Sequence, residues 1–300
     1  MQEQTQVFNR DCLKTRQKRY TSQFLENNFL HEHAARLIAE RLEDITYTFC
    51  NNLYIGRTIP AHILQQYVGQ TSNSTCINMG LLNERNNAGF SVVADEELLP
   101  FSDHKLDLII ANLNLHQTND LPGTLIQIRR ALKPDGLFIA ALFGGETLWE
   151  LRQSLNYADD LISGGMTPRV HPFADKQQMG ALMQRAGFAL PVVDSEFVTV
   201  TYPDIFKLMS DLRKIGETNI INNRLKTFTR RQLFQEAAKY YADHFSDEEG
   251  KILATFEMIF LIGWGPAETQ QKPLKPGSAK VRLADALGTT EIGTGEKAAQ

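Results

Sequence analysis

Cysteine is scarce in this chain of 300 residues: only Cys12, Cys50 and Cys76 occur, and they lie far apart. An odd number with this spacing suits neither a disulfide framework nor a zinc site, so we expect a protein of a reducing compartment. Long apolar runs are also missing, and none reaches the length of a membrane span. The N-terminus lacks the apolar core of a secretory signal peptide.

Excess positive charge is absent as well, and a net charge of −4 gives no general reason to expect a nucleic-acid partner. There is no Gly-x-Ser-x-Gly elbow and no Walker-type loop, which argues against hydrolases and NTPases of those kinds. The seven histidines form no recognisable facial triad, so we expect no metal site. His31 and His33 lie two apart, on different faces of an expected helix, and are interpreted as solvated surface side chains.

The composition that remains, 42% hydrophobic and 22% charged, is typical of a globular protein. The patterning divides the chain into three parts. An N-terminal helical segment is expected over residues 1–45 and an α/β domain over residues 46–265. Residues 266–300 turn to proline, glycine, lysine, threonine and alanine, with little to bury, and we expect a mostly disordered tail there.

The stretch Val92–Phe143 is the most regular part of the α/β domain. Its two short apolar runs, Leu106–Leu113 and Leu137–Phe143, predict buried strands, and Leu121–Leu132 between them has helical spacing. Strand, helix and strand make one βαβ unit with parallel pairing. Ligands of such sheets bind at the carboxyl ends of the strands, which here are Val93–Glu96 and Ala111–Leu113.

The flanking patterns complete the predicted fold. A first strand is expected within residues 46–56, although Asn51 and Asn52 are unusual there, because a central parallel strand is normally apolar on both faces. The fold class is α/β, a doubly wound and mostly parallel sheet with an N-terminal helix and a helical insertion at about residues 203–245, before the last strand. The other expected strands and helices are Thr75–Met79, Phe90–Ala94, Val192–Tyr202 and Ile252–Trp264, and Thr147–Ile162, Asp175–Ala186, Pro203–Ile215 and Thr229–His244.

Three short segments resemble those of class I S-adenosylmethionine-dependent methyltransferases, which have a Rossmann-like fold. They are Asp95–Phe101 (DEELLPF), Leu106–Leu108 (LDL) and Lys133–Leu137 (KPDGL). Further segments are more specific and are similar to the family of mitochondrial complex I assembly factor 5 and its bacterial relatives. They include Phe8–Asp11 (FNRD), His116–Pro122 (HQTNDLP) and Phe143–Leu148 (FGGETL). The resemblance covers nearly the whole chain, up to about Leu283.

The resemblance implies S-adenosyl-L-methionine as cofactor and assigns residues to it. Asp95 stands where methyltransferases accept the adenine amino group; the alternative is a capping or turn carboxylate before Glu96. Asn78 falls at or near the position that holds the ribose hydroxyls. With Glu96 and Asn112 at strand ends, the expected cofactor-binding residues are Asn52, Gly56, Asn78, Asp95, Glu96 and Asn112.

The first cofactor loop departs from the pattern of the resemblance. Where methyltransferases have Asp-Leu-Gly-x-Gly-x-Gly, this chain has Asn52 to Thr58, with Gly56 as the retained glycine, while Tyr54 and Thr58 replace two others. An asparagine still bonds a hydroxyl, but a charge-assisted bond is roughly twice as strong as a neutral one. An alternative hypothesis is therefore a retained fold with a weak or lost cofactor site.

Candidates for the chemical step follow the fourth expected strand. His116 and Asp120 lie four apart and are candidate catalytic residues, as a general base. The alternative is a core role for the histidine and a cap for Asp120, which precedes a helix start. Glu146, Trp149 and Arg152 follow the next strand, where a substrate could enter.

The sequence thus predicts a methyltransferase-like protein that modifies a protein substrate, a respiratory complex I subunit, during complex I assembly. A non-catalytic assembly factor and a carrier-protein methyltransferase of biotin synthesis are the alternatives. Relatives are also connected with arginine hydroxylation, and the sequence leaves the reaction open. We expect a bacterial cytoplasmic protein, with a peripheral position at the inner membrane as the alternative. The basic cluster of Lys14, Arg16, Lys18 and Arg19 is interpreted as a solvated helix face.

Overall fold

The computed structural model describes residues 6–57, 75–80, 90–271, 278 and 281–290. The chain divides into two units, Met1–Pro266 and Ala267–Gln300. The second unit contains one short helix, α9 (Leu283–Leu287). Thr58, which the resemblance places in the first cofactor loop, lies outside the described residues, as do residues 59–74 and 81–89.

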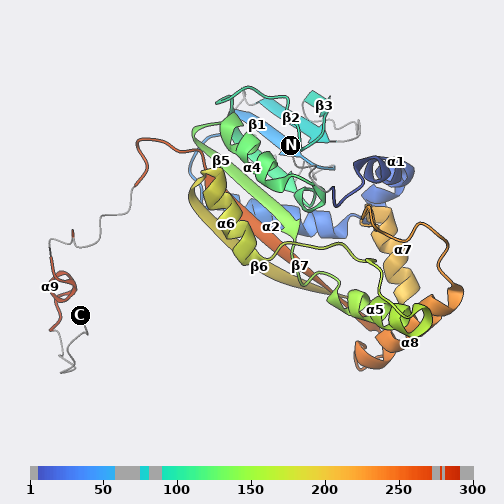
Figure 1. The fold of residues 1–300 in the computed structure, drawn as a ribbon. Helices are drawn as coiled ribbons and strands as arrows, with labels where there is room; N and C mark the ends of the chain where they lie inside the picture. The colour runs from blue at the N-terminus through green and yellow to red at the C-terminus, as the bar shows by residue number, and fades with distance from the viewer. Residues whose placement is uncertain (1–5, 58–74, 81–89, 272–277, 279–280, 291–300) are drawn as a thin grey trace. The chain divides into compact units, whose positions relative to one another are not determined.

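The first unit is built on a seven-stranded sheet in the order β3-β2-β1-β4-β5-β7-β6 (Figure 1). Neighbours from β3 to β5 pair in parallel, whereas β7 runs antiparallel to both β5 and β6. The predicted doubly wound, mostly parallel sheet is therefore confirmed. The strands are β1 (Asn51–Ile55), β2 (Thr75–Gly80), β3 (Phe90–Val93), β4 (Leu106–Asn112), β5 (Leu132–Phe143), β6 (Ala189–Tyr202) and β7 (Ile252–Trp264).

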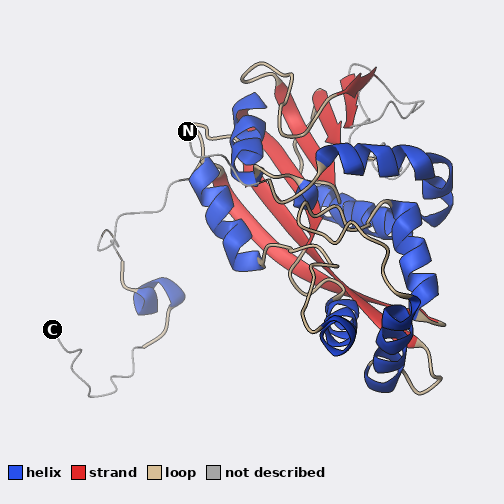
Figure 2. Ribbon diagram, turned by 45° about the vertical axis from the view of Figure 1, so that its right-hand side comes forward, coloured by secondary structure: helices blue, strands red, loops and turns tan. Residues whose placement is uncertain are grey.

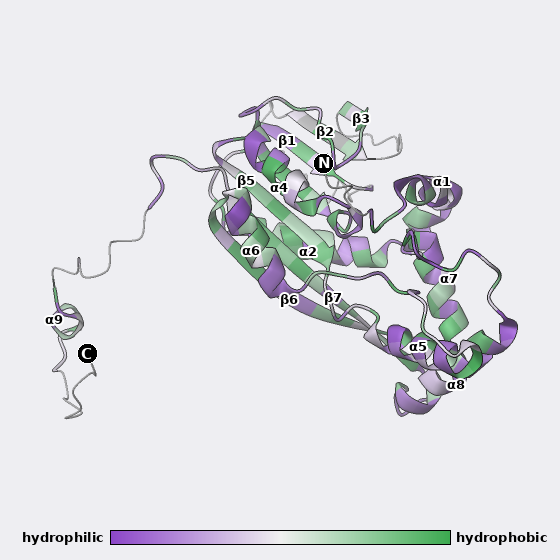
Figure 3. Ribbon diagram, viewed as in Figure 1, coloured by the Kyte–Doolittle hydropathy of each residue, from purple (hydrophilic) through white to green (hydrophobic). Residues whose placement is uncertain are grey.

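Alternate residues of the central strands supply two cores, one on each face of the sheet (Figure 2). On one face, Leu108 and Ile139 pack under α2 (Phe29–Glu43). On the other face, Ile109 and Phe138 pack under α4 (Leu121–Ala131) and α6 (Lys176–Ala186). A strand covered on both faces must be apolar throughout, which is why the central strands are largely hydrophobic in Figure 3.

The N-terminal segment forms two helices and not one. α1 (Arg10–Asn27) ends at Asn28, and α2 begins at Phe29. The prediction that His31 is a solvated surface residue is wrong: its exposed fraction is 2% and its ring lies 4.8 Å from that of Phe24, edge to face. Helical spacing places residues on faces, but only the packing decides which face is covered.

The predicted helical insertion lies between β6 and β7, as α7 (Ile205–Ile215) and α8 (Arg231–His244). Asp204 caps α7 by accepting a hydrogen bond from the backbone N–H of Lys207 at 2.8 Å, and Gly216 ends the helix with a φ of +89°. α7 packs against α1, and α8 against α5 (Trp149–Ser163). Together these helices stand beyond the carboxyl ends of the parallel strands (Figure 1).

β1 starts later than the sequence suggests. The strand begins at Asn51, where the pattern seemed interrupted, and Tyr47 and Phe49 precede it.

No helix in the described part of the chain is both long and apolar enough to cross a membrane.

We expect the fold to depend on the apolar residues of β5. Replacing Ile139, whose exposed fraction is 0%, by alanine leaves a cavity between β5 and α2. The free energy of unfolding should fall by about 2–5 kcal/mol, measured by chemical denaturation. Leu161→Ala, at a residue 59% exposed on α5, should change it by less than about 0.5 kcal/mol. Equal effects of the two substitutions would contradict this packing.

Candidate active site

Gly56 marks the carboxyl end of β1 and needs to be a glycine there. Its φ is +124°, which L side chains rarely adopt, and its N–H donates to the carbonyl of Met79 at 2.9 Å. A Cβ at this position would lie 3.1 Å from the Asn112 carbonyl oxygen and 3.3 Å from the Asn114 side chain. The ends of β1, β2 and β4 therefore meet closely at this point.

Buried amide oxygens collect around this meeting point. Asn112 donates through Nδ2 to the carbonyl of His31 at 3.0 Å, and Asn114 donates to Glu96 at 3.3 Å. The Oδ1 atoms of both asparagines are buried and accept no hydrogen bond from the residues that the structure describes. A buried acceptor without a donor is costly, so two of them together indicate a place for a ligand that carries donors.

Asn52 is less suited to the role that the resemblance gives it. It is fully buried as the second residue of β1, and its Nδ2 donates to the carbonyl of Phe49 at 3.4 Å. Its Oδ1 also accepts no hydrogen bond from the described residues, but Asn52 lies at the start of the strand and not at its carboxyl end. Tyr54 lies in the same strand and packs against the core on the α2 side. Asn78 pairs with Tyr54 and Ser91 across β2, but its side chain is not among those described.

The acidic segment after β3 is held by the N-terminal helix. Arg10 donates to Asp95 at 2.8 Å, to Glu96, and to the carbonyl of Gln117 at 3.1 Å. Burial alone would lower the pKa of Arg10, but the carboxylates of Glu96 and Asp95 raise it above its ordinary value. Asp95 also accepts from the N–H of Glu97 at 3.0 Å through the same Oδ1 atom. Its Oδ2 takes part in none of these bonds and remains available to a ligand.

A second polar cluster lies beyond β4 and centres on Glu217. Its carboxylate accepts from Gln117 at 2.8 Å and lies 3.2 Å from Nε2 of His116. The His116 ring packs against Phe143 and Phe173, with centroids 5.0 and 5.8 Å away. Burial alone would raise the pKa of Glu217, but the neighbouring histidines, His116 first, hold it below its ordinary value.

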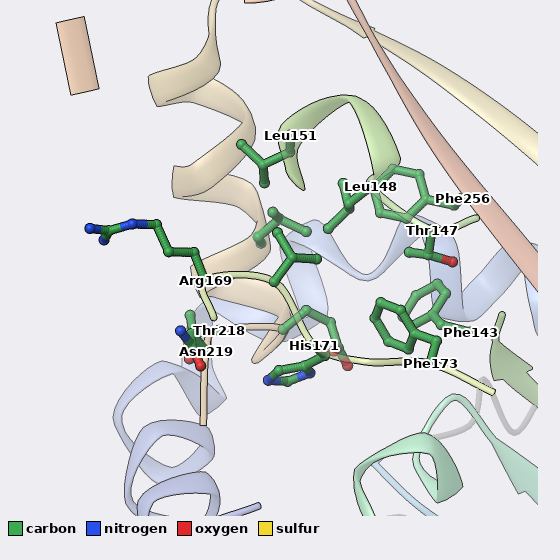
Figure 4. Close-up of a pocket in the computed structure, with 13 residues that line it drawn as sticks. Phe143, Thr147, Leu148, Leu151, Arg169, His171, Phe173, Thr218, Asn219 and Phe256 are labelled. Carbon is green, nitrogen blue, oxygen red and sulfur yellow. The ribbon is translucent and has the colours of Figure 1, made fainter. Parts of the chain in front are cut away.

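A cavity of about 50 Å³ adjoins this cluster (Figure 4). His171 and Phe173, from one loop, line it, and Phe173 lies beside Phe143 at the end of β5, with ring centroids 6.2 Å apart. Glu217 forms part of its wall. Asp159 fixes the same loop through a bidentate pair with Arg169 at 2.6 and 2.7 Å. The remaining lining residues are Thr147, Leu148, Leu151, Val170, Leu212, Thr218, Asn219 and Phe256.

Two buried histidines, His171 in the cavity lining and His31 on α2, have lowered pKa values. Burial lowers the pKa of His171 to about 4, and its Nε2 accepts a hydrogen bond from the N–H of Ile220 at 3.1 Å. Burial likewise lowers the pKa of His31 to about 3. No three histidine, cysteine, aspartate or glutamate side chains in the described ranges are placed to hold a metal ion.

The structure separates the two predicted catalytic candidates. His116 lies against Glu217 at the cavity wall, whereas Asp120 caps α4 by accepting from the N–H of Gly123 at 2.9 Å. The capping alternative therefore describes Asp120 better than a catalytic role. After β5, Arg152 donates to the carbonyls of Gly145 and Thr147, both at 3.0 Å. The exposed Trp149 packs on Phe245.

A strap formed by residues 7–10 crosses the site. The N–H of Phe8 donates to Asn119, and the N–H of Asn9 to the carbonyl of Ile220, each at 2.8 Å. The Phe8 ring lies 5.3 Å from that of His171. The strap thus links the loop after β4 to the loop after α7 and puts Arg10 beside Asp95.

Sequence patterns missed several residues of this site, among them Arg10, Asn114, His171 and Glu217. Arg10 begins α1 and His171 lies in a loop, and the partners of both, Asp95 and Ile220, are distant in sequence. The segments around Phe8 and His116, singled out by resemblance, meet here.

The sheet has the strand order of a class I methyltransferase fold, with β7 antiparallel to its neighbours. The unsatisfied amide oxygens of Asn112 and Asn114 lie at the carboxyl ends of its parallel strands, where such folds bind their ligands. A family model described as "Methyltransferase domain" matches residues 59–140. The structure of the YcgJ protein of Bacillus subtilis is similar, with a TM-score of 0.53 and 16% identity, over 78% of this chain and 99% of that chain.

The chain belongs to the family of the arginine hydroxylase NDUFAF5. It is 39% identical to "Arginine-hydroxylase NDUFAF5, mitochondrial" of Danio rerio, over 93% of this chain and 89% of that protein. It also matches "Malonyl-[acyl-carrier protein] O-methyltransferase" of Nitrosospira multiformis at 37% identity, but over 62% of this chain and 58% of that protein. The predicted family resemblance is thus confirmed.

Neutral, buried His171 should make stability depend on pH. Its pKa of about 4 in the folded chain lies below the ordinary 6.5, so between these pH values the unfolded chain binds a proton that the folded chain does not. The free energy of unfolding should therefore fall as the pH is lowered from 6.5 to 4. His171→Gln keeps an acceptor for Ile220 and should reduce this slope by up to about 1.4 kcal/mol per pH unit.

Denaturation at several pH values measures the slope. Part of it should persist in His171→Gln, since His31 titrates in the same range. His33→Gln, at a half-exposed residue of the same helix as His31, serves as the control and should keep the slope of the wild type. An unchanged slope in His171→Gln would contradict the assignment.

Proposed function

We propose that this chain is an S-adenosylmethionine-dependent enzyme that modifies a side chain of a protein subunit during assembly of respiratory complex I. The observation that carries the proposal is the pair of buried, unsatisfied amide oxygens of Asn112 and Asn114 beside Gly56. The family supports the fold and the connection with protein modification, since its members are named arginine hydroxylases.

The residues at the strand ends suit the parts of the cofactor. An ammonium group needs acceptors, which Asn112 and Asn114 supply through Oδ1. Asp95 has a free Oδ2 for an amino group, and Gly56 lets the backbone approach without a Cβ. When bound, the cofactor supplies an electrophilic methyl group on a sulfonium, so the protein has mainly to position the acceptor.

The cavity beside Glu217 suits a basic side chain of a protein substrate. The names of the relatives point to arginine, and a carboxylate pairs with a guanidinium through charge-assisted hydrogen bonds. His116 and Gln117 hold the Glu217 carboxylate at 3.2 and 2.8 Å, and we assign them positioning roles. Phe143, Phe173 and Phe256 exclude water from the inner wall. Mass spectrometry of the modified subunit would distinguish an added methyl group from an added oxygen atom.

The role of Asp95 in cofactor binding gives a direct test. Asp95→Asn keeps the shape but removes the charge, and it should weaken S-adenosylmethionine binding about tenfold, or about 1.4 kcal/mol. Isothermal calorimetry measures the affinity. The control is Asp103→Asn, at an exposed acid that pairs with Arg130 at 3.0 Å, and it should bind as the wild type does.

Thermal unfolding without ligand checks that Asp95→Asn remains folded, because Asp95 also holds Arg10. Absence of heat and of a thermal shift in the wild type, at roughly millimolar ligand, would refute the cofactor proposal. At that concentration a site with micromolar affinity would be saturated and would stabilise the chain by about 4 kcal/mol.

A non-catalytic assembly factor is the second candidate. It is favoured by Arg10, which already neutralises Asp95 and Glu96, and by Asn52 and Tyr54, which face the interior of the fold and not a glycine loop. Complementation of a strain that lacks this protein separates the candidates. If Asp95→Asn restores complex I as fully as the wild type and co-purifies with its subunits, the chain acts without cofactor. If Asp95→Asn impairs complex I assembly and the control Asp103→Asn does not, the result would favour the enzyme.

A carrier-protein methyltransferase of biotin synthesis is a further candidate, because the chain is partly similar to such an enzyme. Rescue of a biotin auxotroph would favour it. We propose a cytoplasmic location, with peripheral attachment at the inner membrane as the alternative, and cell fractionation tests it.

A further inference from the structure

A large groove opens between α1, α7 and α8, outside the cavity beside His171. Its volume is about 420 Å³, within the range of ligand pockets. It is lined by four arginines, Arg16, Arg19, Arg213 and Arg224, and no acidic residue is part of its lining. We call this space the arginine groove. Tyr20, Leu225 and Phe234 supply its apolar surface, and Thr218 and Asn219 complete it.

The four guanidinium groups have no carboxylate partner in the described part of the chain. Arg16 donates to Oγ1 of Thr218 at 2.9 Å and to the carbonyl of Asn219, and Arg224 donates to the carbonyl of Ile221 at 2.8 Å. These neutral acceptors orient two of the cations without cancelling their charge. The side chains of Arg19 and Arg213 make no hydrogen bond to the described residues.

Other arginines of this region differ from these four because each has a carboxylate partner. Arg169 is paired with Asp159, and Arg10 with Asp95 and Glu96, so both charges are balanced. The solvated-face interpretation of the basic cluster holds for Lys14, Lys18 and Arg19, which are exposed, whereas Arg16 is half-buried. Unbalanced like charges repel one another, and an anionic ligand would relieve that repulsion.

The arginine groove leads toward the candidate active site. A second hollow of about 200 Å³ shares Arg213, Thr218, Asn219 and Phe234 with it. The same hollow shares Glu217, Leu151, Leu212 and Arg169 with the cavity beside His171. An extended chain could therefore reach from the four cations to the Glu217 carboxylate.

We infer that the arginine groove docks an acidic segment of the protein substrate, whose carboxylates pair with these four arginines while the adjoining residues extend toward Glu217. This inference rests on the proposed function, because it supplies recognition for the substrate of that site. The charges are complementary along the path, with cations at the entrance and a carboxylate at the inner end. The net charge of −4 disfavours nucleic acid as the occupant, and the concave shape suits a peptide better than a lipid surface.

The test uses the full chain and a fluorescein-labelled hexaglutamate peptide, with labelled hexalysine for comparison. Fluorescence anisotropy gives the affinity. Arg19→Gln with Arg213→Gln removes two groove charges that make no hydrogen bond within the described residues, so folding should persist. The matched control, Arg36→Gln with Arg185→Gln, removes the same charge from exposed positions on α2 and α6.

We expect hexaglutamate to bind and hexalysine not to bind. The groove double variant should weaken hexaglutamate binding about tenfold or more, since each lost charge-assisted bond contributes to affinity, and the control double variant should stay within about twofold of the wild type. Equal losses in both double variants would show unspecific attraction and overturn the inference. So would a wild type that does not bind hexaglutamate, or one that binds only single-stranded DNA or phosphatidylglycerol vesicles.

This assay contains no S-adenosylmethionine. Hexaglutamate bound in the groove would therefore support docking even if calorimetry found no cofactor site, and cofactor binding without peptide binding would remove only the docking inference.

Discussion

The organisation of the site depends on the ion pairs of Arg10 with Asp95 and Glu96. The guanidinium is largely buried, with 14% of its side chain exposed, and it joins the start of α1 to the segment after β3 and to the carbonyl of Gln117. Removing one partner of a buried pair typically costs about 3–5 kcal/mol, because the other charge stays buried and uncompensated. The N-terminal strap is thus part of the site.

Glu217 joins distant segments of the chain in the second polar cluster, as Arg10 does in the first. It comes from the segment that follows α7, whereas its partners His116 and Gln117 follow β4, so this carboxylate links the helical insertion to the end of the parallel sheet. The two clusters share the segment 115–119, since Arg10 bonds the carbonyl of Gln117 and Glu217 its side chain.

The sequence predicted the sheet well because buried parallel strands such as Leu106–Asn112 must be apolar on both faces. Local chemistry indicated the cap at Asp120, which was the alternative to a catalytic role, and the predicted helix Asp175–Ala186 ends where α6 ends. It failed where the deciding contacts are distant: His31 is buried because Phe24 and the sheet cover it, and Arg10 meets Asp95 across 85 positions. The side-chain role of Asn78 stays a prediction.

The central claim is that the carboxyl ends of β1 to β4 hold S-adenosylmethionine. A crystal structure of the chain with S-adenosylhomocysteine tests it most directly, because that product shares every binding group except the methyl. The account predicts the ligand beside Gly56, with its amino acid part bonded to Asn112 or Asn114 and its adenine amino group bonded to Oδ2 of Asp95. A ligand bound elsewhere, or crystals at saturating ligand in which Asn112, Asn114 and Asp95 contact none, would contradict it.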